Sequence, residues 1–279
     1  MLDSLAIVRR APCALLALAL AVPVLAQEPA PPQASKSPDD QELVAALIKD
    51  TAKSARKREQ DKQTAAFLEK LGVAFLESGP NDRRRIADAA VDCLNVKRKR
   101  LEGEDPEKTW LLPIAAAKAL GTMHPESDKD LAKALQDKAI REQAHVFGAV
   151  ADAAARAADE PARVLLLELL DSKEPGGQQA RLVKAMRHFK TLPEKDRKET
   201  FERVMQSFVE VIGRWDDNDD LIEGLEIKIL YETSANRTLS DLSGGHEEKT
   251  AKDWERWYKA NRKEPWPQTG TSPPKDEDE

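Results

Sequence analysis

The chain has 279 residues, of which 34% are charged, and its 50 acidic against 44 basic side chains give a formal net charge of −6. This acidic balance argues against a nucleic-acid-binding protein, because such proteins obtain most of their affinity from basic side chains. Only two cysteines are present and one lies in the leader described next, so the mature chain cannot form an internal disulfide framework.

Residues 1–26 have the three parts of an export signal. Two arginines form a positive segment, residues 14–24 form an apolar segment, and "VLA" places short side chains before an expected cleavage after Ala26. The apolar run is shorter than the roughly 20 residues of a spanning helix. We therefore expect cleavage, no stable membrane anchor and a periplasmic or secreted protein. Residues 27–38, rich in Pro, Ala and Ser, predict a disordered linker.

No stretch shows the period-two alternation typical of strands, whereas helical periodicity recurs along residues 39–264. The first helices are predicted by pattern alone, over 39–58, 61–77 and 82–100. Cys93 shares the apolar face of the third helix and is interpreted as a small buried side chain rather than a reactive thiol. In the second helix, the apolar residues with helical spacing are Phe67, Leu68, Leu71, Phe75 and Leu76. The sequence therefore predicts an all-α protein.

Three helix pairs follow in the central region. Their first helices contain residues 115–123, 150–158 and 181–189, at offsets of 35 and 31 residues, and each is followed by a Pro-containing turn and a second helix. The first helix is rich in small residues in two of the three pairs, which allows neighbouring helices to approach closely. A single pair cannot bury its apolar faces, whereas stacked pairs can.

The segment "LLPIAAAKALGTMHPESDKDLAKAL" carries a family resemblance. It resembles the HEAT or armadillo-type repeat, in which an Ala-rich helix ending in Leu-Gly is followed by a Pro-containing turn and a Leu-rich helix. The likeness is specific for one repeat and weaker for the next two. It implies an α-α superhelix, a solenoid of about five or six helical hairpins, with the HEAT-like repeats over residues 109–235.

The segment "TLSDLSGGHEEKTAKDWERWYKANR" resembles the end of exported bacterial HEAT-like proteins, where a loop with Leu-x-x-Leu-Ser/Thr-Gly precedes a short helix with Trp-x-x-Trp-Trp/Tyr. The loop pattern is matched by Leu239, Leu242, Ser243 and Gly244, and the helix pattern by Trp254, Trp257 and Tyr258. The charged "GGHEEKT" departs from the family, which more often has an aromatic residue there. The resemblance implies a capping helix over residues 248–262 that covers the last repeat, followed by a disordered acidic tail over 265–279.

The same aromatic segment has a second interpretation, as a platform that binds carbohydrate or cell-wall polymer. Trp266 stands between two prolines and is the ring expected to be partly exposed and to contact such a ligand.

Catalytic, cofactor and metal motifs are not found. His246 opens "HEEKT", whose fifth position is Thr250 rather than the second histidine of a zinc-peptidase helix. His124 is interpreted as a solvated turn residue. The acidic run "WDDNDDLIEGLE" has Leu221 where a calcium loop needs glycine, so it is interpreted as a helix cap. We expect a protein that is not an enzyme and has no cofactor, although fold analogy leaves a lyase as a remote alternative.

The candidate binding residues lie on two helices whose polar stripes face away from their apolar sides. They are Arg141 and His145 on one helix, with Asp152 on the same stripe, and Arg181, Lys184 and His188 on the other. In the family that the chain resembles, such helices line a concave groove. The expected function is therefore a non-enzymatic scaffold or protein–protein interaction module of the bacterial cell envelope, with a protein partner. The alternative is the carbohydrate-binding module that uses Trp266.

Overall fold

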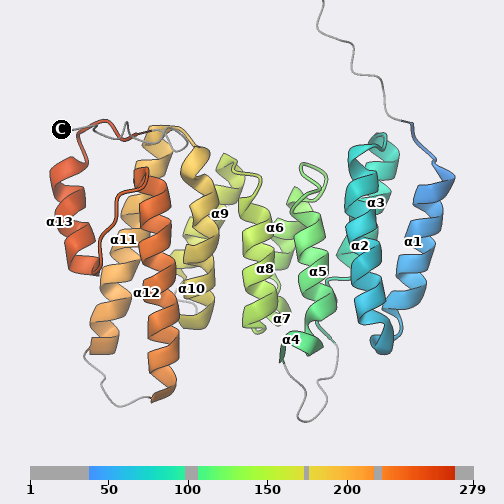
Figure 1. The fold of residues 1–279 in the computed structure, drawn as a ribbon, viewed down its shortest axis with the longest axis horizontal. Helices are drawn as coiled ribbons and strands as arrows, with labels where there is room; N and C mark the ends of the chain where they lie inside the picture. The colour runs from blue at the N-terminus through green and yellow to red at the C-terminus, as the bar shows by residue number, and fades with distance from the viewer. Residues whose placement is uncertain (1–37, 98–105, 173–175, 217–221, 268–279) are drawn as a thin grey trace, which may run out of the picture. The chain divides into compact units, whose positions relative to one another are not determined.

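The computed structural model describes residues 38–97, 106–172, 176–216 and 222–267 (Figure 1). The expected leader, residues 217–221 of the acidic run and most of the expected tail lie outside this range. Every regular element among the described residues is a helix, which confirms the all-α prediction, and none of these helices is long and apolar enough to cross a membrane. The α-helices are α1 Glu42–Ala55, α2 Asp61–Leu76, α3 Pro80–Asp92, α4 Pro106–Thr109, α5 Leu111–Leu120, α6 Asp128–Gln136, α7 Lys138–Arg141, α8 Ala144–Ala155, α9 Glu160–Asp171, α10 Gly176–Ala185, α11 Glu194–Asp216, α12 Ile222–Ser243 and α13 Ala251–Asn261, and short 3-10 turns are η1 Arg58–Gln60 and η2 Met186–Thr191.

The third helix ends earlier than the sequence pattern predicted. The expected range was 82–100, but α3 stops at Asp92, where the backbone N–H groups of Cys93 and Leu94 bond the carbonyls three residues before them. Cys93 is buried, as predicted. Beyond this point the sequence offers few apolar side chains to pack, and the Asn95 side chain accepts a bond from the Lys97 N–H at 2.9 Å instead.

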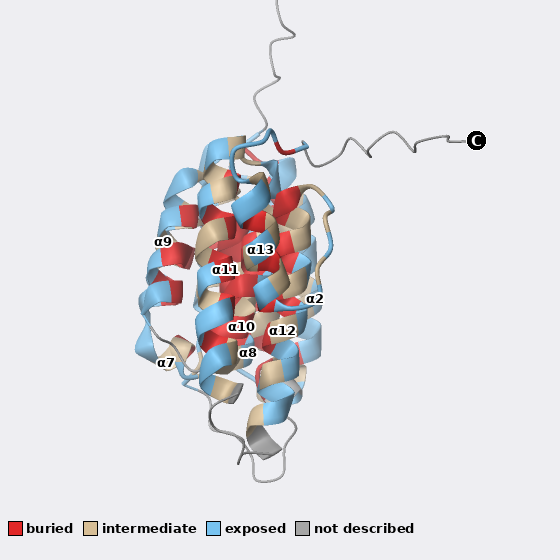
Figure 2. Ribbon diagram, turned by 90° about the vertical axis from the view of Figure 1, so that its left-hand side faces the viewer, coloured by how far each residue is buried: buried red, intermediate tan, exposed pale blue. Residues whose placement is uncertain are grey.

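The helices of the described residues pack in a regular order. Helices α2, α5, α8, α10 and α12 form a row in which each contacts the next, and α6, α9 and α11 pack against this row (Figures 1 and 2). Most buried side chains lie between the row and these helices, while the opposite side of the row faces solvent (Figure 2). The solvent-facing side of the row is therefore the surface on which a partner has access to several helices at once.

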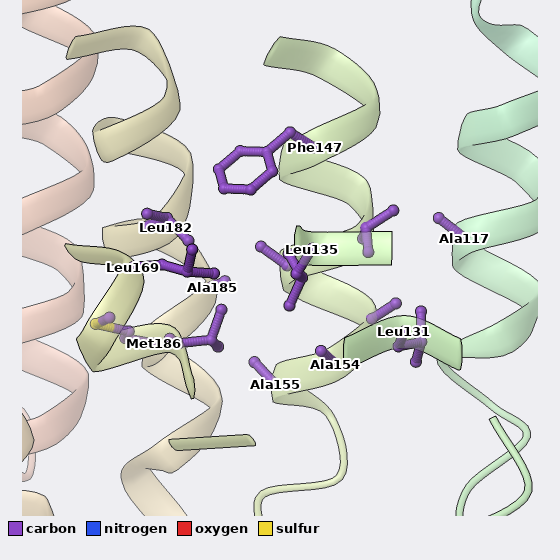
Figure 3. Packing of buried hydrophobic residues seen from close by; sticks show 14 of the residues in the cluster. Ala117, Leu131, Leu135, Phe147, Ala154, Ala155, Leu169, Leu182, Ala185 and Met186 are labelled. Carbon is purple, nitrogen blue, oxygen red and sulfur yellow. The ribbon is translucent and has the colours of Figure 1, made fainter. Parts of the chain in front are cut away.

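Small residues set the spacing inside the row. A Cβ on Gly121, just after α5, would lie 3.0 Å from the Cα of Ala153 on α8, so these backbones approach as closely as glycine permits. Figure 3 shows Ala154 and Ala155 of α8 among larger side chains of the same buried cluster, such as Leu131. The small-residue pattern thus produced the close packing expected of it.

Polar contacts join helices that are not consecutive in the chain. The Arg84 guanidinium of α3 lies 3.0 Å from the Asp130 carboxylate of α6. Arg163 of α9 is almost wholly buried and lies 3.2 Å from the Glu199 carboxylate of α11. These ion pairs link α3 to α6 and α9 to α11.

His124 was expected to be a solvated turn residue, and that expectation is wrong. Its side chain is about one-fifth exposed, its Nδ1 contacts the Asp128 carboxylate, and its Nε2 lies 3.1 Å from the Ala153 carbonyl oxygen. The turn between α5 and α6 packs against α8, so its histidine bonds across that contact rather than to water.

At the C-terminal end, the loop pattern assigned by resemblance lies mostly on a helix. Leu239 and Leu242 are buried on α12, which continues to Ser243. Gly244 then adopts a φ of +88°, and the Gly245 N–H donates to the Ser240 carbonyl at 2.9 Å, which ends the helix. The turn directs the chain back so that α13 packs against α11.

Candidate functional site

An open groove of about 700 Å³ lies between α2 and α5 on the solvent-facing side of the row. Its lining is mainly aliphatic and includes Leu68, Val73, Leu76, Leu111, Ile114 and Ala115. Val73 and Leu76 are 64% and 66% exposed, which is unusual for large apolar side chains on one helix face. We call this feature the α2–α5 groove.

The groove exists because α2 carries apolar residues on two sides. Leu68, Leu71 and Phe75 face the core and are buried, while Val73 and Leu76 point to the other side. Gly72 stands between these groups, and a Cβ there would contact the Thr122 hydroxyl at 3.5 Å. The C-terminal ends of α2 and α5 therefore lie close together, and their side chains form the two walls.

Charged groups border the α2–α5 groove without closing it. Glu69 and Lys118 are exposed on its lining, and neither forms an ion pair with another described residue. His145, in the first turn of α8, also lines the groove. The groove is thus an apolar surface with one acid, one base and one histidine at its border.

Arg181 extends this border onto α10. Its Nη1 donates to the Gly177 carbonyl at 3.0 Å, and its Nη2 lies 3.5 Å from Nδ1 of His145. The stem lies so close to Gly148 that a Cβ there would be 2.5 Å from the Arg181 Cδ. Partial burial lowers the pKa of Arg181, and no carboxylate of the described residues pairs with it. A half-buried guanidinium without an anion is costly to desolvate, so it is a candidate anion-binding group.

His188 and Asp152 form a separate, closed network. His188 Nε2 lies 2.9 Å from Asp152 Oδ1, and Arg156 donates to Asp152 Oδ2 at 3.0 Å. Partial burial raises the Asp152 pKa, but the bonds from His188 and Arg156 outweigh it and hold that pKa at about 2. No hydroxyl or thiol of the described residues bonds to His188, so this pair lacks the nucleophile of an acid–histidine–serine arrangement.

The remaining candidates on these helices are more peripheral. Lys184 is exposed one turn beyond Arg181 and forms no ion pair with a described residue. Arg141 was expected on the helix of His145, but it ends the separate helix α7, and its carbonyl accepts a bond from the Gln178 side chain at 3.1 Å. The structure brings His145 and Arg181 together and links His188 to Asp152. His188 was expected on the helix of Arg181, but it lies on η2, because α10 ends at Ala185.

Trp266 is buried, which contradicts the expected exposure. Its side chain is 5% exposed, and its indole N–H donates to the Asn261 carbonyl at 3.1 Å. The ring packs edge-on against Phe201, with 5.0 Å between centroids. Arg197 donates to the Pro267 carbonyl of the same segment at 3.0 Å. Trp257 is instead the tryptophan of this segment that stays partly exposed. The carbohydrate-binding interpretation loses the accessible ring on which it depended.

Sequence reasoning missed the α2–α5 groove. It placed Leu76 on the same apolar face as Phe75, but Phe75 is buried and Leu76 is exposed. One signal was present, since Val73 lies off the stripe of Leu68, Leu71 and Phe75 and has no reason to be apolar on a solvated face.

No group of three or more His, Cys, Asp or Glu side chains that could hold a metal ion occurs within the part of the chain that the structure describes. Comparisons with known proteins add no identification: no family model, no curated protein and no solved structure matches this chain.

Proposed function

We propose that this chain is an exported stack of HEAT-type helical repeats that acts as a non-enzymatic interaction module of the cell envelope. In this proposal a partner protein binds the solvent-facing side of α2, α5, α8 and α10. The observation that carries it is the α2–α5 groove, in which Val73 and Leu76 remain about two-thirds exposed.

The groove favours binding over a purely structural role because exposed aliphatic side chains gather there rather than lying singly. The groove has a volume of about 700 Å³ and is open along the surface, so side chains of another molecule have room to enter it. The order of packing, with each helix of the row against the next, supports the repeat stack. Export is supported by the three-part pattern of residues 1–26.

The test is site-specific photo-crosslinking in the organism that encodes the chain. A benzophenone amino acid is placed at Leu76 in the groove or at Leu43 on α1, a matched control because both leucines are 66% exposed and only Leu76 lines the groove. We expect one protein to be crosslinked from Leu76 and not from Leu43. Equal adducts from both positions, or no protein adduct from Leu76, would overturn the proposal.

A further inference from the structure

The charges beside the α2–α5 groove are not balanced within the described residues. Three cations, Lys118, Arg181 and Lys184, form no ion pair there, and the acid on the groove lining is Glu69. Asp152 is the acid on α8, the helix beside α10, but His188 and Arg156 already bond it. The surface therefore carries three cations without an ion pair among the described residues against one such acid, Glu69.

Arg181 is the most informative of these cations because it is held in place. The contact with Gly148 fixes its stem, and the bond to the Gly177 carbonyl leaves the rest of the guanidinium directed toward His145. Such preorganisation reduces the entropy lost when a guanidinium binds a carboxylate. Lys184 and Lys118 are exposed and contribute mainly to the local potential.

The Arg181–His145 pair and the groove belong to one surface. His145 lines the groove and lies 3.5 Å from Arg181. Helices α5 and α8 run in the same direction, since Gly121 at the end of α5 meets Ala153 near the end of α8. His145 in the first turn of α8 is therefore beside the start of α5, and the aliphatic groove extends from there toward Leu76 at the end of α2.

We propose that the segment bound here is an amphipathic helix of the partner protein, whose apolar side chains fill the α2–α5 groove and whose Asp or Glu bonds Arg181 beside His145. This inference rests on the proposed function and names the chemistry of its partner. A helix fits because the groove is an open channel between two side-by-side helices, which accepts the ridge of a third. An acyl chain would instead favour an enclosed pocket that removes it from water on all sides.

The test uses the full-length chain and a random peptide display library. After selection, the enriched peptides are sequenced, synthesised with a fluorescent label and titrated by anisotropy. We expect apolar residues at i, i+3 or i+4, and i+7, with an excess of Asp and Glu. Replacing those acids by Asn and Gln should weaken binding about tenfold or more, as should Arg181→Gln. Binding of the acidic peptides should also weaken at high salt.

Matched variants separate the two parts of the site. Arg181→Gln keeps a polar stem over Gly148, and Lys133→Gln on α6 removes an exposed cation without touching the surface. Leu76→Asp tests the groove, and Leu43→Asp is its control at equal exposure. Only Arg181→Gln and Leu76→Asp should reduce affinity, and each must keep the wild-type melting temperature to be counted.

The failure of this inference is distinct from failure of the proposed function. If the enriched peptides lack acids, or if Arg181→Gln binds them as tightly as wild type, the carboxylate contact is wrong while crosslinking from Leu76 still supports a protein partner. If no peptide is enriched, or if long-chain fatty acids compete where peptides do not, the helical partner is wrong. If crosslinking from Leu76 also fails, the proposed function falls with it.

Discussion

Two apolar surfaces of this chain differ in whether other parts of the chain cover them. At the C-terminal end, Phe201 packs against the rings of Trp254, Trp257, Tyr258 and Trp266 at centroid distances of 5.0–5.7 Å. We call these five residues the aromatic cap. In the α2–α5 groove, by contrast, Val73 and Leu76 meet no covering element among the described residues and stay 64% and 66% exposed. The chain covers one apolar surface with its own α13 and leaves the other accessible.

The polar atoms of the aromatic cap explain why it is closed. The Trp254 indole donates to the Asn236 side chain at 2.8 Å, and the Tyr258 hydroxyl donates to Glu202 at 3.0 Å. Burial and the nearby Glu202 carboxylate raise the Tyr258 pKa to about 12, so this hydroxyl stays protonated and remains a donor. His246 stacks on Trp257 with 4.5 Å between centroids, where an aromatic residue was expected from the family resemblance. Large rings with satisfied donors form a completed core.

The largest expected effect is a loss of stability when the aromatic cap is disrupted. Trp254→Ala removes a fully buried indole from the centre of the aromatic cap and leaves Asn236 Oδ1 without its indole donor. We expect the free energy of unfolding to fall by about 3–5 kcal/mol, measured by urea denaturation. A loss below about 1 kcal/mol would show that the cap contributes little, and the contrast with the groove would disappear.

A smaller effect is expected from the turn that leads into the aromatic cap. Gly244→Ala places a side chain at φ +88°, with its Cβ 2.6 Å from Pro267 Cγ, so the segment carrying Trp266 must shift. We expect a loss of about 1–3 kcal/mol and a red shift of tryptophan fluorescence as Trp266 meets water.

Gly213→Ala is the matched control for this turn. A Cβ there has nothing within 4 Å and lies inside α11, so the substitution should stabilise the protein by about 0.5–1 kcal/mol. Equal effects of the two substitutions would contradict the strain assigned to Gly244.

The charge of Asp152, which His188 and Arg156 bond, should contribute to the free energy of unfolding in a pH-dependent way. The folded-state pKa of Asp152 is about 2, below the value of about 3.9 in unfolded chains. A depressed carboxyl pKa stabilises the fold above the unfolded pKa, and this contribution is lost as the pH falls from about 4 to about 2. Asp152→Asn should therefore cost about 1–2 kcal/mol at neutral pH, allowing for partial solvent screening.

The measurement is urea denaturation of wild type and Asp152→Asn at a series of pH values. The difference in unfolding free energy should shrink between about pH 4 and pH 2. A difference that stays constant across this window would show that Asp152 acts through packing or neutral hydrogen bonds rather than through its charge.

The smallest effect is expected in the groove. Val73→Ser and Leu76→Ser should change the unfolding free energy by no more than about 0.5 kcal/mol, because both side chains are mostly exposed. The same urea titration used for Trp254→Ala provides the comparison. A loss above about 1 kcal/mol would place these side chains in the core and remove the argument for a binding surface.

Several features of the site were readable before the fold. The polar stripes of two helices predicted that Arg181 and His145 share a surface, and helix packing brings them to 3.5 Å. The aromatic stripe of Trp254, Trp257 and Tyr258 predicted one buried face, which packs on Phe201. Residues on one helix face keep their relation whatever the helix packs against. Arg141 and His188 do not follow the predicted stripes, because they lie on α7 and η2 rather than on α8 and α10.

The burial of other residues depended on which helices and segments pack together in the fold. Trp266 has no periodic neighbours, so its burial follows from Arg197 reaching the Pro267 carbonyl, a contact between residues 70 positions apart. Leu76 directly follows Phe75 in the apolar pattern of α2, yet Phe75 faces the core and Leu76 faces solvent.

The amino-acid sequence by itself therefore determined the all-helical class, most helix breaks at Pro and Gly, and the small-residue faces that allow close packing, because these follow from local backbone preferences and spacing. The tertiary structure alone decided that Trp266 is buried with the C-terminal aromatic residues and that the α2–α5 surface is not covered. The physical reason is that burial is a property of pairs of surfaces, and a sequence pattern describes each surface without its partner.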